Sequence, residues 1–227
     1  MIGIIGRKLG MTQIFNEAGQ QIPCTVVEAE PNPVTKVMTK ETAGFASVEL
    51  GFGAQRLARE SKKGERTPRG ARASKAAVAQ AAKVGLEAPP AVLRSFRLDD
   101  APGKAPEIPT YSVGDKVTVG IFQPGETVKV TGTSKGRGFQ GMVKRHYAGG
   151  GPNTHGNTKH RRPGSVGAGT DPSRVIKGKR MPGHYGAAQH TQTHLRVEKI
   201  DAERNLIYIR GSVAGPKNGI VLVRKQG

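Results

Sequence analysis

The sequence predicts a mainly β protein: a small closed β-barrel with a basic, partly helical insertion and a long extended loop. Three observations predict this class. Short segments of alternating apolar and polar residues recur towards both ends of the chain, and turn residues such as Gly, Pro, Asn and Asp separate them. Between residues 135 and 190 no apolar repeat with a period of 2 or 3.6 residues persists. Many short strands with little helix favour a closed barrel, because closure leaves no exposed sheet edge.

The first fifty residues are predicted to form short strands in a β meander. Alternating apolar residues occupy Ile2 and Ile4 and then residues 11–15, 22–28, 34–39 and 47–51. Turn residues at 16–19 and 31–33 separate these segments. The chain has one cysteine, which cannot form an internal disulfide, so we expect Cys24 to be a small buried side chain in a strand.

Residues 54–94 change in composition and are predicted to be a basic insertion in the β domain. A short helix is expected from Ser74, as N-cap, to Lys83, with Gly85 just beyond its end. The alternative for this segment is a flexible linker. Strand patterns return at residues 111–122, 126–133, 194–200, 206–210 and 220–224, and residues 201–205 join two of these as a hairpin. The expected barrel core therefore consists of residues 1–53, 95–134 and 191–227.

The charge of the chain indicates a polyanionic partner. The 227 residues contain 36 Lys plus Arg against 17 Asp plus Glu, a formal net charge of +19. Nucleic acid fits best, because each phosphate that a cation neutralises releases a condensed counterion. A membrane is the rival polyanion, but no segment reaches the roughly 18 apolar residues of a membrane span and the N-terminus lacks a signal-peptide block. We expect a soluble cytoplasmic protein with no membrane partner.

Residues 135–190 are predicted to be an extended loop that contacts RNA. They hold eleven Lys or Arg, one acid, Asp171, and five of the six histidines. Arg can bind phosphate or stack on a base, and His can stack on unpaired bases. Gly136, Gly138 and Gly141 allow a close backbone approach. The expected RNA-contacting residues are Lys135, Arg137, Lys144, Arg145, His146, His155, Lys159, His160, Arg161, Arg162, Arg174, Lys177, Lys179, Arg180 and His184. The alternative is a disordered basic segment without defined contacts.

An enzyme is the other class to be weighed. Residues 136–141, GRGFQG, match the dinucleotide pattern G-x-G-x-x-G, but the expected helix and the acidic residue about 20 positions later are missing from the pattern that follows. His155, His160, His184 and His190 lack the cysteines or carboxylates of a zinc site. Ser165 has no nucleophile elbow around it. We therefore expect no catalytic residues, no metal, no cofactor and no small-molecule substrate.

Five segments of the chain resemble one family in the same order. VTGTSKGRGFQGMVKRH, residues 130–146, closely resembles the central motif of the universal large-subunit ribosomal protein L-three family, bacterial type. MIGIIGRKLGMTQIF, THGNTKHRRPGSVG, VIKGKRMPGHYG and VEKIDAERNLIYIRGSVAGPKNG are also similar to it. The family's serine, three glycines and arginine fall on Ser134, Gly136, Gly138, Gly141 and Arg145.

Two positions depart from the family's pattern. Lys129 stands where the family usually has Asp or Asn. Thr170 stands where some bacterial relatives carry a glutamine that is methylated on its side chain, so that modification is not expected here.

The resemblance implies a translation-protein-type β-barrel on the surface of the large ribosomal subunit. It also implies that the long loop threads through 23S rRNA towards the peptidyl transferase centre, with Gly169 and Thr170 at the tip nearest to it. A protein of this kind binds early, helps to nucleate subunit assembly, contacts neighbouring large-subunit proteins and performs no catalysis. Two rival functions remain open: a free RNA chaperone or regulator, and an architectural DNA-binding protein, although no groove-reading helix or ribbon is predicted.

Overall fold

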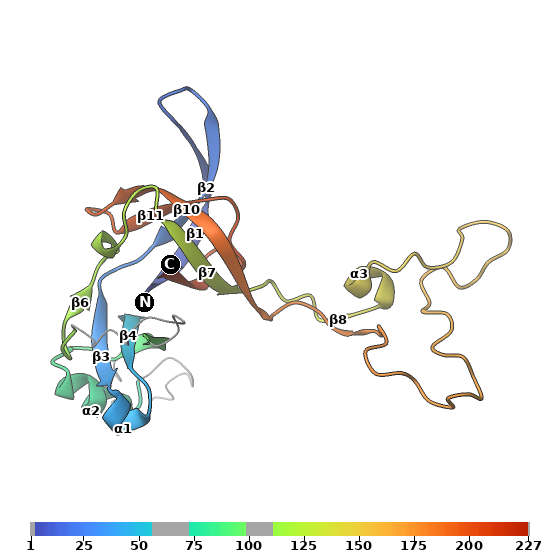
Figure 1. Ribbon diagram of the computed structural model, residues 1–227, viewed down its shortest axis with the longest axis horizontal. Coiled ribbons are helices and arrows are strands. Elements are labelled where there is room, and N and C mark those ends of the chain that lie inside the picture. Colours follow the sequence, from blue (N-terminus) through green and yellow to red (C-terminus); the bar gives the residue numbers. More distant parts are fainter. Residues whose placement is uncertain (1–2, 56–72, 99–110, 227) are drawn as a thin grey trace, which may run out of the picture. The chain divides into compact units, whose positions relative to one another are not determined.

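The protein contains two compact units (Figure 1). One holds the segments with strand patterns, and the other corresponds to the basic loop. The computed structural model describes residues 3–55, 73–98 and 111–226. Unit 1 consists of Met1–Thr133 with His190–Gly227, and unit 2 consists of Ser134–Gln189. Strands far outnumber helices among the described residues, so the predicted mainly β class is confirmed. Ile2, residues 56–72 of the expected insertion and residues 99–110 lie outside the described part.

Six strands of unit 1 form a ring in which each strand pairs with its neighbours. The order is β1-β12-β7-β10-β11-β2, and β2 pairs back to β1 in antiparallel fashion. The strands are β1 (Gly3–Phe15), β2 (Gln21–Glu28), β7 (Thr127–Thr133), β10 (Gln189–Asp201), β11 (Leu206–Arg210) and β12 (Ile220–Lys225). The hairpin expected at residues 201–205 is confirmed, because Asp201 pairs with Leu206 across it.

A second sheet of four strands belongs to the same unit and was not expected. Its order is β5-β4-β3-β6, from β5 (Pro90–Arg97), β4 (Ser47–Ala54), β3 (Asn32–Met38) and β6 (Lys116–Val117). Strands β2 and β3 therefore lie in different sheets, so the predicted meander of the first fifty residues is wrong. The strand expected over residues 111–122 is also mostly wrong, because only β6 and the 3-10 turn η1 (Val119–Ile121) form there.

Alternation along β1 joins the two sheets through their cores. Ile4 is fully buried in a cluster with Val27, Val130 and Ile207 from other strands of the ring. Its neighbour Ile5 points to the opposite face and is buried in the cluster of the second sheet. Asn32 adds a polar link, since its amide side chain accepts from the backbone nitrogen of Ile5 at 2.9 Å and donates to the carbonyl of Ile5 at 3.1 Å.

The helices of unit 1 are short, and one of them was predicted. Helix α2 (Lys75–Lys83) begins after Ser74, whose hydroxyl accepts from the backbone nitrogen of Ala77 at 3.2 Å, and Gly85 follows with φ of +78°. The prediction of Ser74 as N-cap is therefore confirmed. Helix α1 (Lys40–Ala43) is a single turn between β3 and β4.

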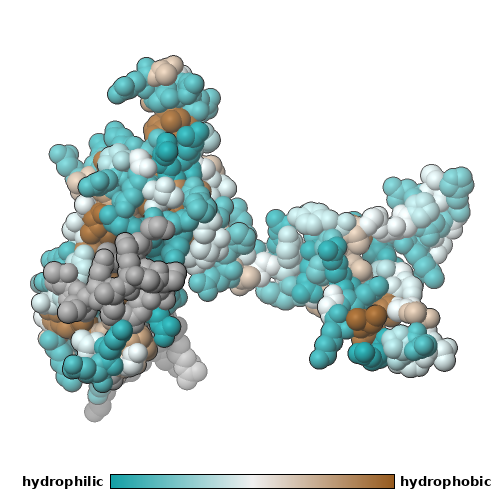
Figure 2. Space-filling view, in the orientation of Figure 1, coloured by the Kyte–Doolittle hydropathy of each residue, from teal (hydrophilic) through white to brown (hydrophobic). Residues whose placement is uncertain are grey.

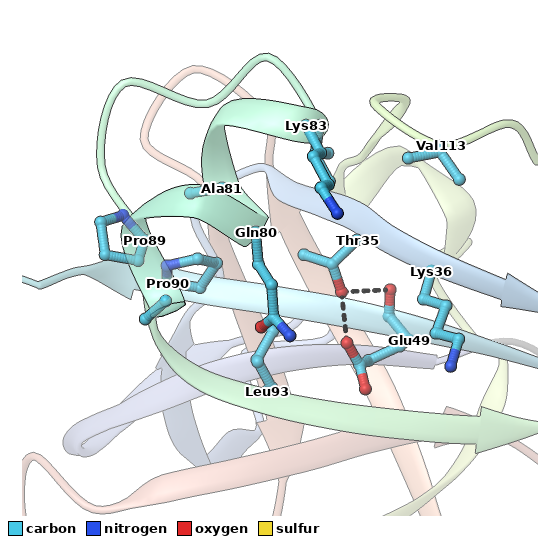
Figure 3. A pocket seen from close by; sticks show the side chains of 12 residues that line it. Thr35, Lys36, Glu49, Gln80, Ala81, Lys83, Pro89, Pro90, Leu93 and Val113 are labelled. Carbon is cyan, nitrogen blue, oxygen red and sulfur yellow. Dashed lines mark hydrogen bonds between the residues drawn. The ribbon is translucent and has the colours of Figure 1, made fainter. Parts of the chain in front are cut away.

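A cavity of about 490 Å³ remains between α2 and the second sheet (Figure 3). Ala81 is the buried residue of α2, and its small side chain leaves space above the strands. Across the cavity, the Thr35 hydroxyl lies 2.7 Å from a carboxylate oxygen of Glu49 and 3.2 Å from its backbone carbonyl (Figure 3). Two polar groups of the cavity floor, those of Thr35 and Glu49, thus bond to each other.

Cys24 occupies the place that the sequence predicted. It lies in β2 and its side chain is fully buried. Burial raises the pKa of its thiol above 9.0, and the nearby Glu198 adds to that rise while Arg210 opposes it. The protonated thiol is therefore a small apolar component of the core.

Candidate nucleic-acid interface

Unit 2 has the composition of a binding arm and lacks a core of its own. Of residues 134–189, not one is buried in the structure. Its elements are β8 (Phe139–Gln140), helix α3 (Met142–His146) and β9 (Gly183–His184); the rest is turn and extended chain (Figure 1). A segment that buries so little apolar surface gains little stability from folding alone, so its conformation suits a partner that supplies burial.

A hydrogen-bonded stem begins and ends unit 2. The backbone nitrogen of Ser134 donates to the carbonyl of Ala188 at 2.9 Å, and the Ser134 hydroxyl bonds to the same residue. Further along, the nitrogen of Tyr185 donates to the carbonyl of Gly138 at 2.9 Å, and β8 pairs with β9. A Cβ on Gly186 would lie 2.1 Å from the carbonyl oxygen of Lys135, so the two chains meet where a side chain does not fit.

Two of the residues predicted to contact RNA join helix α3 to Met181, just before β9. The Arg145 guanidinium donates to the carbonyl of Met181 at 2.7 Å, and Nε2 of His146 lies 3.2 Å from the same oxygen. A Cβ on Gly183 would lie 2.7 Å from the guanidinium, so glycine at this position lets the arginine cross the strand. Both Arg145 and His146 are half-buried. Their first role in the structure is to hold the arm's fold.

A compact turn over residues 150–160 positions two more of the predicted residues. The nitrogen of Gly151 donates to the carbonyl of His160 at 3.0 Å, and Nδ1 of His160 lies 3.0 Å from the carbonyl of Pro152. The Asn157 side chain donates to the same Pro152 oxygen at 2.7 Å and accepts from the nitrogen of Lys159 at 3.1 Å. The side chain of Lys159 is left exposed on this turn.

Residues 161–180 are exposed throughout and carry the densest run of cations. Arg161, Arg162, Arg174, Lys177, Lys179 and Arg180 lie in this segment. The Ser165 hydroxyl donates to the carbonyl of Gly167 at 2.9 Å, and the Ser173 hydroxyl bonds to the carbonyl of Thr170. Gly169 has φ of +98°, which only glycine adopts at little cost.

The electrostatics of unit 2 are one-sided. Its eleven cations face one acid, Asp171, and in the described part of the chain the ion pairs all lie in unit 1. Its visible face is hydrophilic or neutral except for a small hydrophobic patch (Figure 2). Uncompensated like charges repel one another, and a polyanion offsets that repulsion while releasing counterions.

Aromatic rings add a second kind of contact. Phe139 and Tyr147 expose 76% and 82% of their surface. The guanidinium of Arg137 lies 5.1 Å from the ring centre of Tyr185, and a hydrogen bond with Tyr147 raises the pKa of Tyr185. Rings at this exposure can stack on unpaired bases, so Phe139 is a candidate contact that the sequence analysis missed. An aromatic residue between glycines, as in GRGFQG, was the signal for it.

The structure brings some of the predicted residues together and leaves most of them apart. Thirteen of the fifteen predicted RNA-contacting residues are exposed, and Arg145 and His146 are the half-buried exceptions. Arg137, His184, Arg145 and His146 gather around the stem and α3, whereas the others are spread along the turns. Lys129, one of the two departures from the family's pattern, lies in β7 opposite Arg224 and outside unit 2.

The three glycines of the central motif differ in their surroundings. Gly136 would place a Cβ 3.4 Å from that of Ala187, Gly138 has φ of +65°, and Gly141 has open space around it. No atom of the described chain lies near a Cβ at Gly141, so the fold itself does not require glycine there. The predicted close approach of RNA to these glycines stays a prediction.

Three observations bear on the alternatives weighed from the sequence. Residues 136–141 are followed by α3, a helix the sequence analysis did not predict, but it ends after five residues, at Tyr147 with φ of +56°. No group of three His, Cys, Asp or Glu that could hold a metal occurs among the residues that the structure describes. Within the same residues, no helix is long and apolar enough to cross a membrane.

The fold and this interface define a class: a β-sheet protein that carries a coreless, cationic, glycine-rich arm inside its chain. Comparison with known proteins makes the assignment specific. The family described as ribosomal protein L3 matches residues 110–206. The protein is 44% identical to large ribosomal subunit protein uL3 of Macrococcus caseolyticus and 46% identical to that of Herpetosiphon aurantiacus, in each case over 98% of this chain and 95% of the relative. It is 41% identical to uL3 of Alkaliphilus metalliredigens over the full length of both chains.

The chain belongs to the ribosomal protein L3 family, whose members are structural components of the ribosome and not enzymes. The resemblance inferred from the five sequence segments is thereby confirmed.

Proposed function

We propose that this chain is a structural constituent of the large ribosomal subunit that binds 23S rRNA directly through unit 2. The observation that carries the proposal is the set of eleven cations, none paired with a carboxylate in the described structure, on a unit with no buried residue. RNA supplies both the charge and the surface that this unit lacks. The relatives are named as large ribosomal subunit proteins, and this supports a place for the chain in that subunit.

The two units have different parts in this proposal. Residues 1–53, 95–134 and 191–227 form the core that sits on the subunit surface. The six-stranded ring of this core is a closed β-barrel of the translation-protein type, and the sheet β5-β4-β3-β6 belongs to the same core. The ring order of six strands supports closure. Residues 54–94 are a basic insertion of that core, and residues 135–190 penetrate the rRNA. The protein helps to nucleate assembly in the cytoplasm and has neighbouring ribosomal proteins as further partners.

Within unit 2 the cations divide into one that holds the fold and ten exposed ones, of which about eight meet phosphates. Arg145 is already bonded to Met181. The other ten side chains are exposed, Arg137 among them over the ring of Tyr185, and they can bind phosphates where RNA helices crowd together. Gly169 and Thr170 lie in the exposed segment 161–180, between Arg162 and Arg174. They form the tip that approaches the peptidyl transferase centre. The side chains of the tip shape the RNA there and perform no chemistry.

Subunit membership is tested on a sucrose gradient. A lysate is separated, the large-subunit fraction is washed in high salt, and mass spectrometry measures how much of the chain remains. Retention is expected, because an integral component is held by buried contacts that salt screens little. Release to the top of the gradient would favour a transient RNA-binding factor such as a chaperone.

Direct RNA binding is tested by the salt dependence of affinity for a 23S rRNA fragment. If about eight of the ten exposed cations meet phosphates, the slope of log affinity against log salt is about −6 to −7. Arg161→Gln with Arg162→Gln reduces the magnitude of the slope by about 1.5. Lys75→Gln with Lys83→Gln, on α2 of unit 1, removes the same charge and leaves it unchanged. A wild-type slope shallower than about −3 contradicts the threading of unit 2 through RNA.

A further inference from the structure

One part of unit 1 has the opposite electrostatic character from the rest of the chain. Residues 9–35 contain no Lys or Arg and three acids, Glu17, Glu28 and Glu30, in a protein of net charge +19. No other stretch without a cation in the sequence is as long. Residues 9–28 of this stretch form most of the hairpin between β1 and β2, and the rest leads into β3. We call the distal end of the hairpin, residues 11–23, the hairpin tip. A surface meant for phosphate would not lack cations in this way.

The hairpin tip is paired along its length and exposes apolar side chains. In Figure 1 the blue hairpin extends past the other strands of the ring. Its strands remain in register to the end, where Phe15 pairs with Gln21. The turn is closed by Asn16, whose side chain accepts from the nitrogen of Gln20 at 2.7 Å. Met11 and Phe15 are 55% and 66% exposed. They lie on one face of β1 with Gln13 between them, so this face exposes two apolar side chains two positions either side of a polar one.

One edge of the hairpin tip is open. Strand β1 pairs with β12 only from Gly3 to Arg7, and the backbone of Lys8 still bonds to Gly219 and Asn218. Beyond that point, no described strand pairs with β1 on the side away from β2. Exposed edges are usually protected by Lys or Pro, and residues 9–15 contain neither. The backbone groups of this edge are available to an added strand.

A groove beside the tip combines apolar and acidic groups. It measures about 690 Å³ and is lined by Ile14, Phe15 and Ile22 of the hairpin together with Glu17, Glu198 and Lys199. Glu198 is already paired with Arg210 at 3.7 Å, whereas no ion pair of Glu17 is found among the residues that the structure describes. Lys and Arg side chains have apolar stems and charged ends, so a groove of this kind suits them.

We propose that the hairpin tip docks a basic, extended segment of another protein, which adds along the open edge of β1 and places its apolar side chains on Met11 and Phe15. This inference rests on the proposed place of the chain in a particle whose other proteins are available as partners. Charge complementarity favours a cationic polypeptide over RNA, because the hairpin tip itself carries Glu17 and no cation, and the groove beside it holds two carboxylates, Glu17 and Glu198, against Lys199.

The test uses photo-crosslinking in assembled large subunits. The photoreactive residue p-benzoyl-phenylalanine replaces Phe15 in the full chain, and subunits are isolated and irradiated. Met11 is a second position, since both side chains are exposed and the replacement leaves the core intact. Tyr147 of unit 2, which is 82% exposed, is the matched aromatic control, and there the probe is expected to react with rRNA.

The expected result is an adduct at Phe15 that resists ribonuclease, is removed by protease and yields a partner peptide with more Lys and Arg than acids. An adduct with rRNA, an adduct with an acidic peptide, or no adduct at Phe15 and Met11 while Tyr147 reacts with rRNA, overturns the proposal. Absence of the chain from the subunits, or no reaction of Tyr147 with rRNA, overturns the proposed function instead and removes the basis of this one.

Charge reversal provides a second measurement. Glu17→Lys lowers the yield of the Phe15 adduct about threefold, because it replaces an attraction by a repulsion at an exposed site. Glu203→Lys, in the exposed turn between β10 and β11, changes the net charge equally and leaves the yield unchanged. Equal yields in both variants would show that charge does not select the partner, and the cationic partner would be wrong.

Discussion

Replacing Arg145 separates a structural cation from the phosphate-binding cations around it. Its guanidinium donates to the carbonyl of Met181 at 2.7 Å and joins α3 to the chain that leads into β9. A hydrogen bond to a charged donor contributes about 1.5–3 kcal/mol when it is well buried. This one is only partly buried, so we expect Arg145→Ala to cost about 1 kcal/mol of local stability. That corresponds to about a fivefold larger opening equilibrium of the stem and α3.

The assay is amide hydrogen exchange of the full chain in its native state. The reporters are the amides of Arg137 and Tyr185, which donate across the stem to the carbonyls of Tyr185 and Gly138, both at 2.9 Å. Their protection is expected to fall about fivefold in Arg145→Ala. Lys144→Ala is the matched control, because Lys144 is an exposed cation of the same helix. Its replacement should leave the protection of the Arg137 and Tyr185 amides unchanged.

A second variant perturbs the same contact without removing the arginine. In Gly183→Ala the new Cβ would lie 2.7 Å from the guanidinium and displace it from Met181. It should lower protection in the same amides. If Arg145→Ala and Gly183→Ala both leave protection unchanged, while Arg145→Ala weakens RNA binding and flattens its salt slope as Lys144→Ala does, then Arg145 is a phosphate ligand and the reasoning from its bond to Met181 is wrong.

Three further predictions follow from individual residues. Gly138→Ala is expected to lower local stability by about 1 kcal/mol, because the φ of +65° is strained for alanine while the space around the new Cβ is open. Gly186→Ala has a similar φ and also brings its Cβ to 2.1 Å from the carbonyl oxygen of Lys135, so it should abolish protection of the stem amides in the exchange assay. Gly169→Val strains the position with φ of +98° and is expected to alter sensitivity to antibiotics of the peptidyl transferase site in growth assays; unchanged translation and sensitivity would remove that role from the tip. Burial raises the pKa of the Cys24 thiol, so its contribution to stability is full below 9.0 and is lost as pH rises above it; the stability lost between pH 8 and pH 10 in thermal unfolding should be smaller in Cys24→Ala.

Features set by neighbouring residues were predictable from the sequence. The N-cap Ser74 and the glycine after Lys83 fix α2 locally, and residues 201–205 fix a hairpin whose strands are adjacent in the chain. The buried Cys24 followed from its apolar strand. In each case the deciding contacts lie within a few residues, where capping, turns and alternation act.

Features set by distant residues were not predictable in the same way. The alternation that marked residues 34–39 and 47–51 as strands does not say which sheet they join. That depends on the register of β1, which turns the buried side chain of Ile5 away from the interior of the ring and into the second sheet. The buried Asn32 that links the two sheets carries no local signal of its role. Helix α3 was missed because it is five residues long and its fastening to Met181 spans 36 positions of sequence.

The charge distribution accounts for why one chain contains two units of such different construction. Unit 1 buries Ile4, Ile5 and their clusters, so hydrophobic burial can stabilise it without a partner. Unit 2 has only its stem, the bond of Arg145 and the turns of its glycines, while its cations repel one another. Adding cations strengthens the binding of RNA and at the same time weakens the free fold of unit 2. The balance requires unit 2 to be held at both ends by a stable unit, and β7 and β10 of the ring enter and leave it in this way.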